Sequence, residues 1–165
     1  MFPQDLLDAA TTLLDRCRTG GLTLVTAESC TGGLVAGCLT AIPGSSDVVD
    51  RGFVTYSNEA KIELLGTPKD VIEVYGAVSE ETARAMATAA LERCRADVSV
   101  AVTGVAGPGG GTPEKPVGLV HFASASPGRE TLHARFVFDG DRAAVRLQSV
   151  AAAIVLLRRQ VEAAT

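Results

Sequence analysis

The segment "LTLVTAESCTGGLVA", residues 22–36, places a turn rich in polar residues and glycine between two apolar runs. The first run, over 22–27, predicts a buried strand, and the second predicts a helix over 31–41 that stops at Pro43 and Gly44. A strand that enters a helix through a short turn is typical of proteins in which helices pack on a sheet. This segment therefore favours an α/β fold.

The rest of the chain repeats this alternation of helical and strand patterns. Apolar spacing predicts helices over 5–18, 58–65, 79–95 and 141–163, and strands over 52–57, 97–103, 117–124 and 131–138. The last two strands flank Pro127 and Gly128, which predicts a hairpin. We expect residues 1–165 to form a single three-layer α/β/α domain, with a mostly parallel or mixed sheet flanked by helices.

The bulk composition narrows the class of protein. Hydrophobic residues make up 47% of the 165 residues, which excludes a disordered chain. The longest apolar stretch, 150–157, is too short to cross a bilayer, and the N-terminus is acidic where a secretory signal would be basic. The net charge is −4 and no dense Lys/Arg cluster is present. We expect a cytoplasmic protein that binds neither membranes nor nucleic acid.

The four cysteines do not suggest a metal or a disulfide framework. Cys17, Cys30, Cys38 and Cys94 form no CxxC pair and have no metal-ligand spacing, so we interpret them as free thiols. We expect neither a metal nor a cofactor. Cys30 lies within the turn of 22–36 and is therefore a competing candidate for a nucleophile.

Both buried strands run into glycine-rich loops. The strand over 22–27 is followed by "ESCTGG", and the strand over 97–103 is followed by "GVAGPGGG". If these strands are parallel, both loops lie at the carboxyl edge of the sheet, where open α/β sheets bind ligands. Glycine lets backbone amides approach a ligand, and the helix N-terminus after Gly32 and Gly33 favours an anion. Ordinary tight turns are the alternative for either loop taken alone.

Ser29 is the candidate nucleophile, because it lies at the sharp exit of a strand. A serine needs a base. His121 and His133 both fall in the predicted hairpin, and we interpret them as ordinary strand residues.

Lys61 is the remaining candidate base. On the helix over 58–65 it shares a stripe with Leu64 and Leu65, and a lysine held against apolar surface has a lowered pKa. A surface lysine whose stem covers apolar residues is an equal alternative. Tyr56 ends the preceding strand, and its hydroxyl could reach the same site or simply pack. The residues alone therefore indicate a candidate serine, a candidate lysine and two loops suited to a polar or anionic small molecule. They do not indicate which reaction is catalysed.

Five segments, taken together and in order, resemble the CinA C-terminal domain family. They are "TAESCTGGL", "GFVTYSNEAK", "YGAVSEETA", "TGVAGPGGGTPEKPVG" and "GDRAAVR", and the resemblance covers about residues 5–160. The family includes stand-alone nicotinamide mononucleotide deamidases, and its other common arrangement adds a large N-terminal nucleotide-processing domain. We expect the single-domain form.

The resemblance implies hydrolysis of nicotinamide mononucleotide to nicotinic acid mononucleotide and ammonia. It implies Ser29 as the nucleophile, with Lys61 and Tyr56 assisting proton transfer. Backbone amides around Cys30 and Thr31 are then expected to hold the oxyanion. No metal or other cofactor is implied.

The resemblance also implies a small pyridine nucleotide as the substrate, and a homo-oligomer. The substrate-binding residues that we expect are Cys30, Thr31, Gly32, Gly33, Asn58, Thr103, Gly104, Gly107 and Arg142. Two other functions stay open. One is a nucleotide-sensing or partner-binding module without turnover, and the other is an amidase that acts on another pyridine nucleotide or carboxamide.

Overall fold

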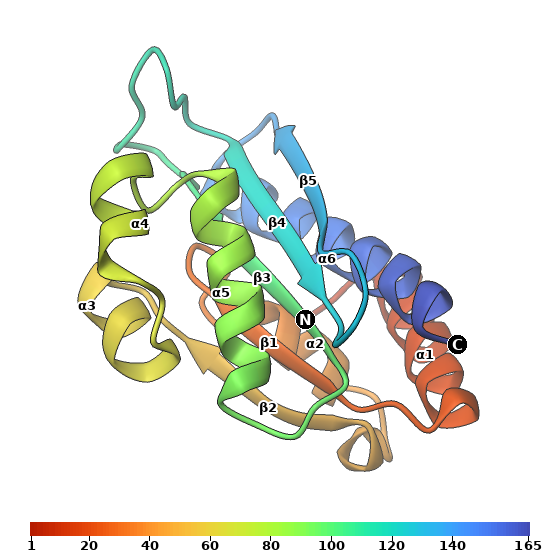
Figure 1. Ribbon diagram of the computed structural model, residues 1–165. Coiled ribbons are helices and arrows are strands. Elements are labelled where there is room, and N and C mark those ends of the chain that lie inside the picture. Colours follow the sequence, from red (N-terminus) through yellow and green to blue (C-terminus); the bar gives the residue numbers. More distant parts are fainter.

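A five-stranded mixed sheet organises the molecule in the computed structural model, which describes residues 1–165 (Figure 1). The strand order is β2-β1-β3-β4-β5; β2, β1 and β3 are parallel, and β4 runs antiparallel to both of its neighbours, β3 and β5. The strands are β1 (Leu24–Glu28), β2 (Val49–Val54), β3 (Val98–Gly104), β4 (Leu119–Ala125) and β5 (Leu132–Val137). The predicted mixed sheet and the predicted hairpin are confirmed.

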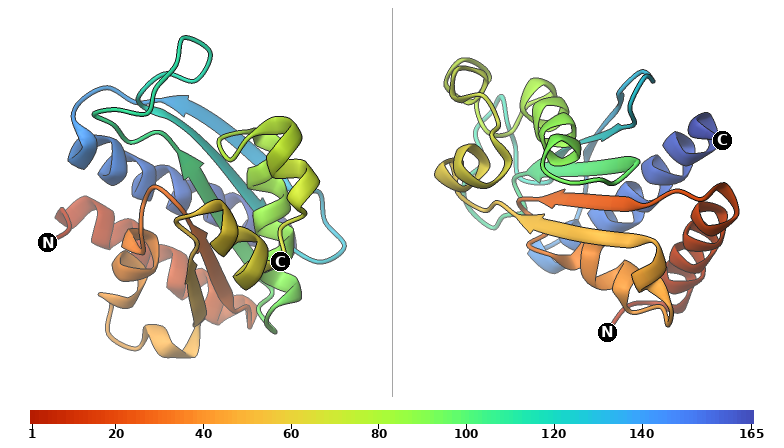
Figure 2. Two further views of the ribbon diagram at one scale, coloured as in Figure 1. Left: turned by 90° about the vertical axis from the view of Figure 1, so that its left-hand side faces the viewer. Right: turned by 60° about the horizontal axis from the view of Figure 1, so that its bottom comes forward.

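Helices cover both faces of this sheet, which confirms the three-layer prediction (Figure 2). One face packs against α1 (Gln4–Gly20), α2 (Leu34–Thr40) and α6 (Arg142–Ala164). The other packs against α5 (Glu80–Glu92), beside which lie α3 (Asn58–Ala60), the π-helical turn η2 (Lys61–Leu65) and α4 (Lys69–Tyr75). A short 3₁₀ turn, η1 (Ser45–Asp47), precedes β2. No helix has the length and apolarity that a membrane span requires.

Two apolar clusters, one on each face of the sheet, form the core. Alternate residues of β3 point to opposite faces, so Val100 joins the larger cluster under α1, α2 and α6, and Ala101 joins the smaller one under α5. Alanines such as Ala83, Ala87 and Ala123 dominate the smaller cluster. Because these side chains are small, α5 can lie close to the strands.

Several elements differ from the sequence predictions. The helix predicted over 58–65 consists of α3 and the π-helical turn η2, and the helix predicted over 79–95 ends at Glu92. The strand predicted over 52–57 lies at 49–54, and the helix predicted from residue 31 begins at Leu34, because a wider turn precedes it. Helix α4 was not predicted, since its start at Pro68 resembles a turn; in the structure Pro68 flanks the first turn of the helix, where the missing N–H of proline costs nothing.

Candidate active site

Ser29 and Lys61 come together at the carboxyl edge of the sheet. Ser29 Oγ and Lys61 Nζ are hydrogen-bonded at 3.1 Å. Lys61 Nζ also donates to the carbonyl oxygens of Thr55 at 3.0 Å and Ser57 at 3.5 Å. Both partners of the pair are buried, and Lys61 is only 1% exposed. A serine hydroxyl paired with a buried amine is an arrangement in which the amine can take the hydroxyl proton.

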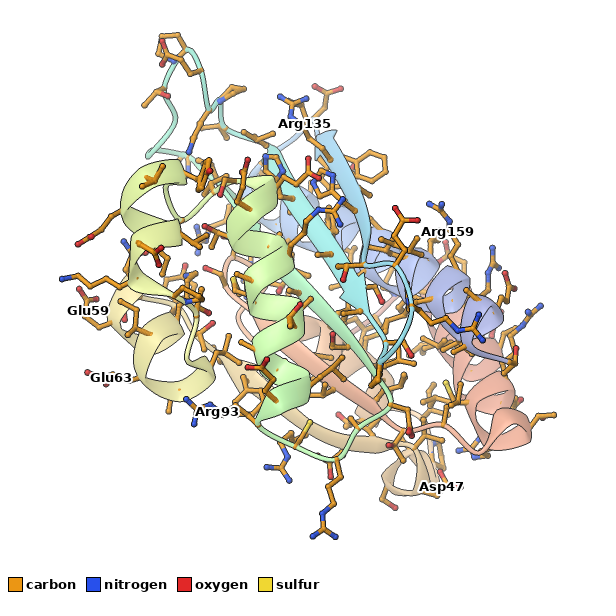
Figure 3. All side chains as sticks on the ribbon, viewed as in Figure 1. Asp47, Glu59, Glu63, Arg93, Arg135 and Arg159 are labelled. Atoms are coloured by element: carbon orange, nitrogen blue, oxygen red, sulfur yellow. The ribbon has the colours of Figure 1, made fainter.

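The π-helical turn η2 directs Lys61 inward. Glu59 and Glu63, two positions before and after it, point outward into solvent on the far side of this segment (Figure 3). Leu65 is buried with Lys61, whereas Leu64 is 52% exposed. The predicted apolar stripe is therefore correct for Leu65 and wrong for Leu64. π-helical turns are rare and are often found at functional sites.

Burial shifts the protonation of the candidate base Lys61 and of the competing nucleophile Cys30. Burial lowers the pKa of Lys61 from its ordinary value of 10.5, which favours the neutral amine. Burial raises the pKa of the Cys30 thiol to about 11, so the thiolate is scarce at neutral pH. Ser29 therefore contacts a candidate base, whereas the adjacent Cys30 is mainly in its less reactive thiol form.

The turn after β1 is closed by backbone bonds. Ser29 N–H donates to the Val102 carbonyl of β3 at 2.9 Å, and Gly32 N–H donates to the Ser29 carbonyl at 3.0 Å. Gly32 has a φ of +57°, a conformation that favours glycine. Neither the Cys30 N–H nor the Thr31 N–H donates a hydrogen bond to another residue.

A buried carboxylate occupies the N-terminus of α2. The Glu28 side chain accepts hydrogen bonds from the N–H groups of Gly33 and Val35 at 3.0 Å and of Ala36 at 2.8 Å, and from Thr26 Oγ1 at 3.2 Å. These amides would otherwise lack partners at the helix start. This helix N-terminus does hold an anion, as the sequence predicts, but the anion is the side chain of Glu28 and not a ligand. The sequence does not predict this role, because it shows only that a glutamate directly precedes the turn.

Arg142 and Tyr56 meet beside the second glycine loop. The Tyr56 hydroxyl accepts a hydrogen bond from Arg142 Nη2, and Arg142 Nη1 donates to the Gly107 carbonyl at 2.9 Å. Tyr56 is 58% exposed, and no hydrogen bond joins its hydroxyl to Ser29 or Lys61. The structure thus groups three of the predicted residues into a second cluster at the same edge of the sheet.

An open pocket of about 610 Å³ lies between this loop and the start of α6. Its lining consists of Ala106, Pro108, Val117, Gly140, Asp141, Arg142, Ala143 and Arg146. Neither arginine forms an ion pair with a carboxylate. Arg146 also donates to the carbonyls of Cys30 and Thr31, so it connects the pocket with the turn that carries Ser29. A larger pocket, of about 720 Å³, lies between α1 and the end of α6, on elements that carry neither Ser29 nor Lys61.

The other predicted residues have structural partners of their own. Thr103 Oγ1 donates to the Ala77 carbonyl at 2.7 Å and so ties β3 to the segment before α5. Asn58 is exposed at the start of α3. Gly104 ends β3, where a Cβ would lie 2.6 Å from the Leu119 carbonyl oxygen. No group of three or more His, Cys, Asp or Glu side chains could hold a metal ion.

The two histidines lie on β4 and β5, as the strand interpretation predicts, and they also contact each other. His121 Nδ1 lies 3.1 Å from His133 Nε2, and His133 Nδ1 lies 3.4 Å from Glu80. Burial, with a contribution from His133, lowers the pKa of His121 to about 4. Neither histidine is hydrogen-bonded to Ser29 or Lys61, so the lysine is the base that the structure places on the serine.

The fold and the site together define an α/β domain with a serine–lysine pair at the carboxyl edge of its sheet. The CinA C-terminal domain family model matches residues 7–161. The chain belongs to this family, which confirms the resemblance seen in the five sequence segments.

Individual relatives fall into two length classes. A putative competence-damage inducible protein of Symbiobacterium thermophilum is 54% identical over 84% of this chain, which spans only 34% of that relative's length. The nicotinamide-nucleotide amidohydrolase PncC of Escherichia coli K12 is 46% identical over 97% of both chains. Among solved structures, the competence/damage inducible protein CihA from Agrobacterium tumefaciens superposes with a TM-score of 0.94 at 48% identity, covering 98% of both chains.

Proposed function

We propose that this protein hydrolyses the carboxamide of nicotinamide mononucleotide to a carboxylate and ammonia. The observation that carries the proposal is the 3.1 Å hydrogen bond between Ser29 Oγ and the buried Lys61 Nζ. An identity of 46% over almost the whole chain to a relative named for this activity supports the choice of substrate. The reaction needs a nucleophile, a base and an oxyanion site, and each has a candidate within the turn and its neighbours.

The first half of the reaction forms an ester on Ser29. Ser29 Oγ bonds to the carboxamide carbon as its proton passes to neutral Lys61 Nζ, and the carbonyl oxygen becomes an oxyanion. The free N–H groups of Cys30 and Thr31 are the proposed donors to this oxyanion. The C–N bond then breaks, and the proton on Lys61 moves to the leaving nitrogen to give ammonia.

The second half releases the product. A water molecule gives a proton to Lys61 while its oxygen bonds to the ester carbon, and the bond from that carbon to Ser29 Oγ then breaks. Ser29 recovers the proton, and nicotinic acid mononucleotide leaves. Tyr56 is proposed to assist these transfers, since it stands between Thr55 and Ser57, whose carbonyls hold Lys61 Nζ.

The phosphate of the substrate is proposed to bind near Arg142, in the pocket between the second glycine loop and α6. Arg142 and Arg146 line this pocket without a carboxylate partner, which leaves two cations for an anion. The N-terminus of α2 is the less suitable place, because Glu28 already occupies it.

We also propose that residues 1–165 act as one domain, in the cytoplasm and as a homo-oligomer. One sheet with a core cluster on each face supports the single domain. The outer strand β5 has a free edge on which Phe136 and Val137 are about half exposed, and this supports self-association. Sedimentation velocity measures the oligomer directly.

Ammonia release from a panel of carboxamides tests the activity. Nicotinamide mononucleotide should release ammonia, and nicotinamide and glutamine should release little. Release from another carboxamide with none from the mononucleotide would identify an amidase of different specificity. Binding of the mononucleotide without release from any carboxamide would instead identify a sensing module.

A further inference from the structure

Arg146 holds the two carbonyl groups that follow the nucleophile. Its Nε donates to the Cys30 carbonyl at 3.1 Å, and its Nη2 donates to the Thr31 carbonyl at 2.9 Å. The two donors belong to one rigid, planar guanidinium, so they fix both carbonyls together. Gly32 lies against the same group, because a Cβ there would be 3.2 Å from Arg146 Nη2.

The direction of these carbonyls decides the direction of the free amides. The peptide between Cys30 and Thr31 is trans, since Gly107–Pro108 is the one cis bond of the chain. In a planar trans peptide the C=O and the following N–H point to opposite sides. With its carbonyl turned to Arg146, the Cys30–Thr31 peptide therefore points its N–H, which has no partner, away from Arg146.

Arg146 and Lys61 reach this region from opposite faces of the sheet. Arg146 belongs to α6, which packs with α1 and α2, whereas Lys61 belongs to η2, which packs with α5 (Figure 2). An N–H that points away from α6 faces the side of the sheet that carries η2 and Lys61. This orientation suits a donor to an oxyanion that forms beside Ser29.

We propose that Arg146 is a positioning residue, which orients the Thr31 N–H as an oxyanion donor by holding the carbonyls of Cys30 and Thr31. The inference rests on the proposed amide hydrolysis and adds a residue to it. Arg146 acts through the backbone and does not touch the reacting atoms. Its guanidinium has no carboxylate partner, so its full positive charge also lies beside the turn.

Three variants test this role. Loss of one oxyanion donor typically lowers kcat by about 100-fold or more, so Arg146→Met should lower kcat by about that factor, whatever change in KM follows from losing its charge beside the pocket. Arg146→Lys should lie between Arg146→Met and wild type, since an ammonium can hold one carbonyl but not both. Arg158→Met, on the exposed side of the same helix, is the matched control and should retain wild-type kinetics.

A second readout does not depend on turnover. In ¹H–¹⁵N spectra of the ligand-free protein, Arg146→Met should shift the amide resonances of Thr31 and Gly32, and Arg158→Met should leave them in place. Rates are normalised to the folded fraction, so that simple loss of folded protein does not count as a loss of kcat.

The possible results separate the two proposals. An Arg146→Met enzyme with unchanged kcat would overturn the positioning role. If its KM is raised while kcat is unchanged, Arg146 is instead a ligand of the substrate phosphate. Unshifted Thr31 and Gly32 amides would overturn it as well. If wild type and Arg158→Met release no ammonia, the proposed hydrolysis fails, and the amide shifts alone decide whether Arg146 holds the turn.

Discussion

The amine of Lys61 is held by three oxygen atoms, and only one of them belongs to a reactive group. The carbonyls of Thr55 and Ser57 fix Nζ in place, and Ser29 Oγ is the third partner. A buried amine surrounded by neutral partners loses much of the hydration that stabilises its charged form. The burial that makes the charged form of Lys61 unfavourable in the fold therefore also favours the neutral amine, which can act as a base.

The base role of Lys61 predicts how activity depends on pH. Its pKa is lowered by burial, so kcat/KM should rise with pH through that lowered value and then level off. Lys61→Met should lose at least about 100-fold in rate, the usual contribution of a general base. Lys61→Arg should not restore it, because a guanidinium stays protonated. More than a tenth of wild-type activity in Lys61→Arg would reject the base role.

The lowered pKa of Lys61 should also appear in stability. Between this value and the ordinary 10.5, the unfolded chain binds more protons at residue 61 than the folded one does. The free energy of unfolding contributed by Lys61 is therefore least favourable below the folded-state pKa and rises with pH across that window. Urea titrations from pH 7 to 10.5 should show this rise in wild type and not in Lys61→Met.

Cys30 should prove dispensable for chemistry. Burial raises the pKa of its thiol to about 11, and the adjacent serine already holds the base. Cys30→Ala should keep kcat within about threefold of wild type, with Cys38→Ala as a control of similar burial. Loss of activity in Cys30→Ala but not in Cys38→Ala would point to the thiol instead.

Among the elements, the junction of β1 and α2 depends on Glu28. Its carboxylate accepts four hydrogen bonds, and a glutamine amide can accept at only one of its two positions. Glu28→Gln should lower the free energy of unfolding by about 1–3 kcal/mol and should also lower kcat, because the turn that carries Ser29 loosens. Glu63→Gln, on the exposed side of η2, is the control. Equal urea midpoints for the two variants would show that Glu28 is not an anchor.

The second glycine loop and the start of α6 should recognise the phosphate. Nicotinamide riboside, which lacks it, should have a much lower kcat/KM than the mononucleotide. Arg142→Met should lower kcat/KM for the mononucleotide more than for the riboside, since it removes a cation that lines the pocket. Equal kcat/KM values of the wild-type protein for both substrates would show that the protein makes no specific contact with the phosphate.

Local sequence patterns predicted the helices and strands better than they predicted which side chains form hydrogen bonds with each other. The strands over 22–27 and 97–103 were found because they are uninterrupted apolar runs with turn signals, and Ser29 was found because it ends one of them. The contacts of Arg146 span 115 and 116 positions along the chain, and no periodicity encodes contacts of that range. The role of Glu28 was missed for a related reason, since its bonds depend on how the turn folds back.

For the whole molecule, the edge of one sheet gathers residues from segments far apart in the chain. Ser29 follows β1, Lys61 comes from η2 on one face, and Arg142 and Arg146 come from α6 on the other. The chain carries a net charge of −4, yet the pocket at this edge presents two arginines without carboxylate partners. An anionic substrate is therefore favoured at this place and disfavoured over much of the remaining surface.

Trapping the ester on Ser29 tests the central claim most directly. Protein mixed with nicotinamide mononucleotide and quenched in acid within the first turnovers should gain the mass of the substrate less ammonia, on the peptide that contains Ser29. Ser29→Ala should show no adduct and should release ammonia at least about 1,000-fold more slowly, as expected for a lost nucleophile. An adduct on Cys30, or ammonia release by Ser29→Ala at more than a tenth of the wild-type rate, would contradict the account.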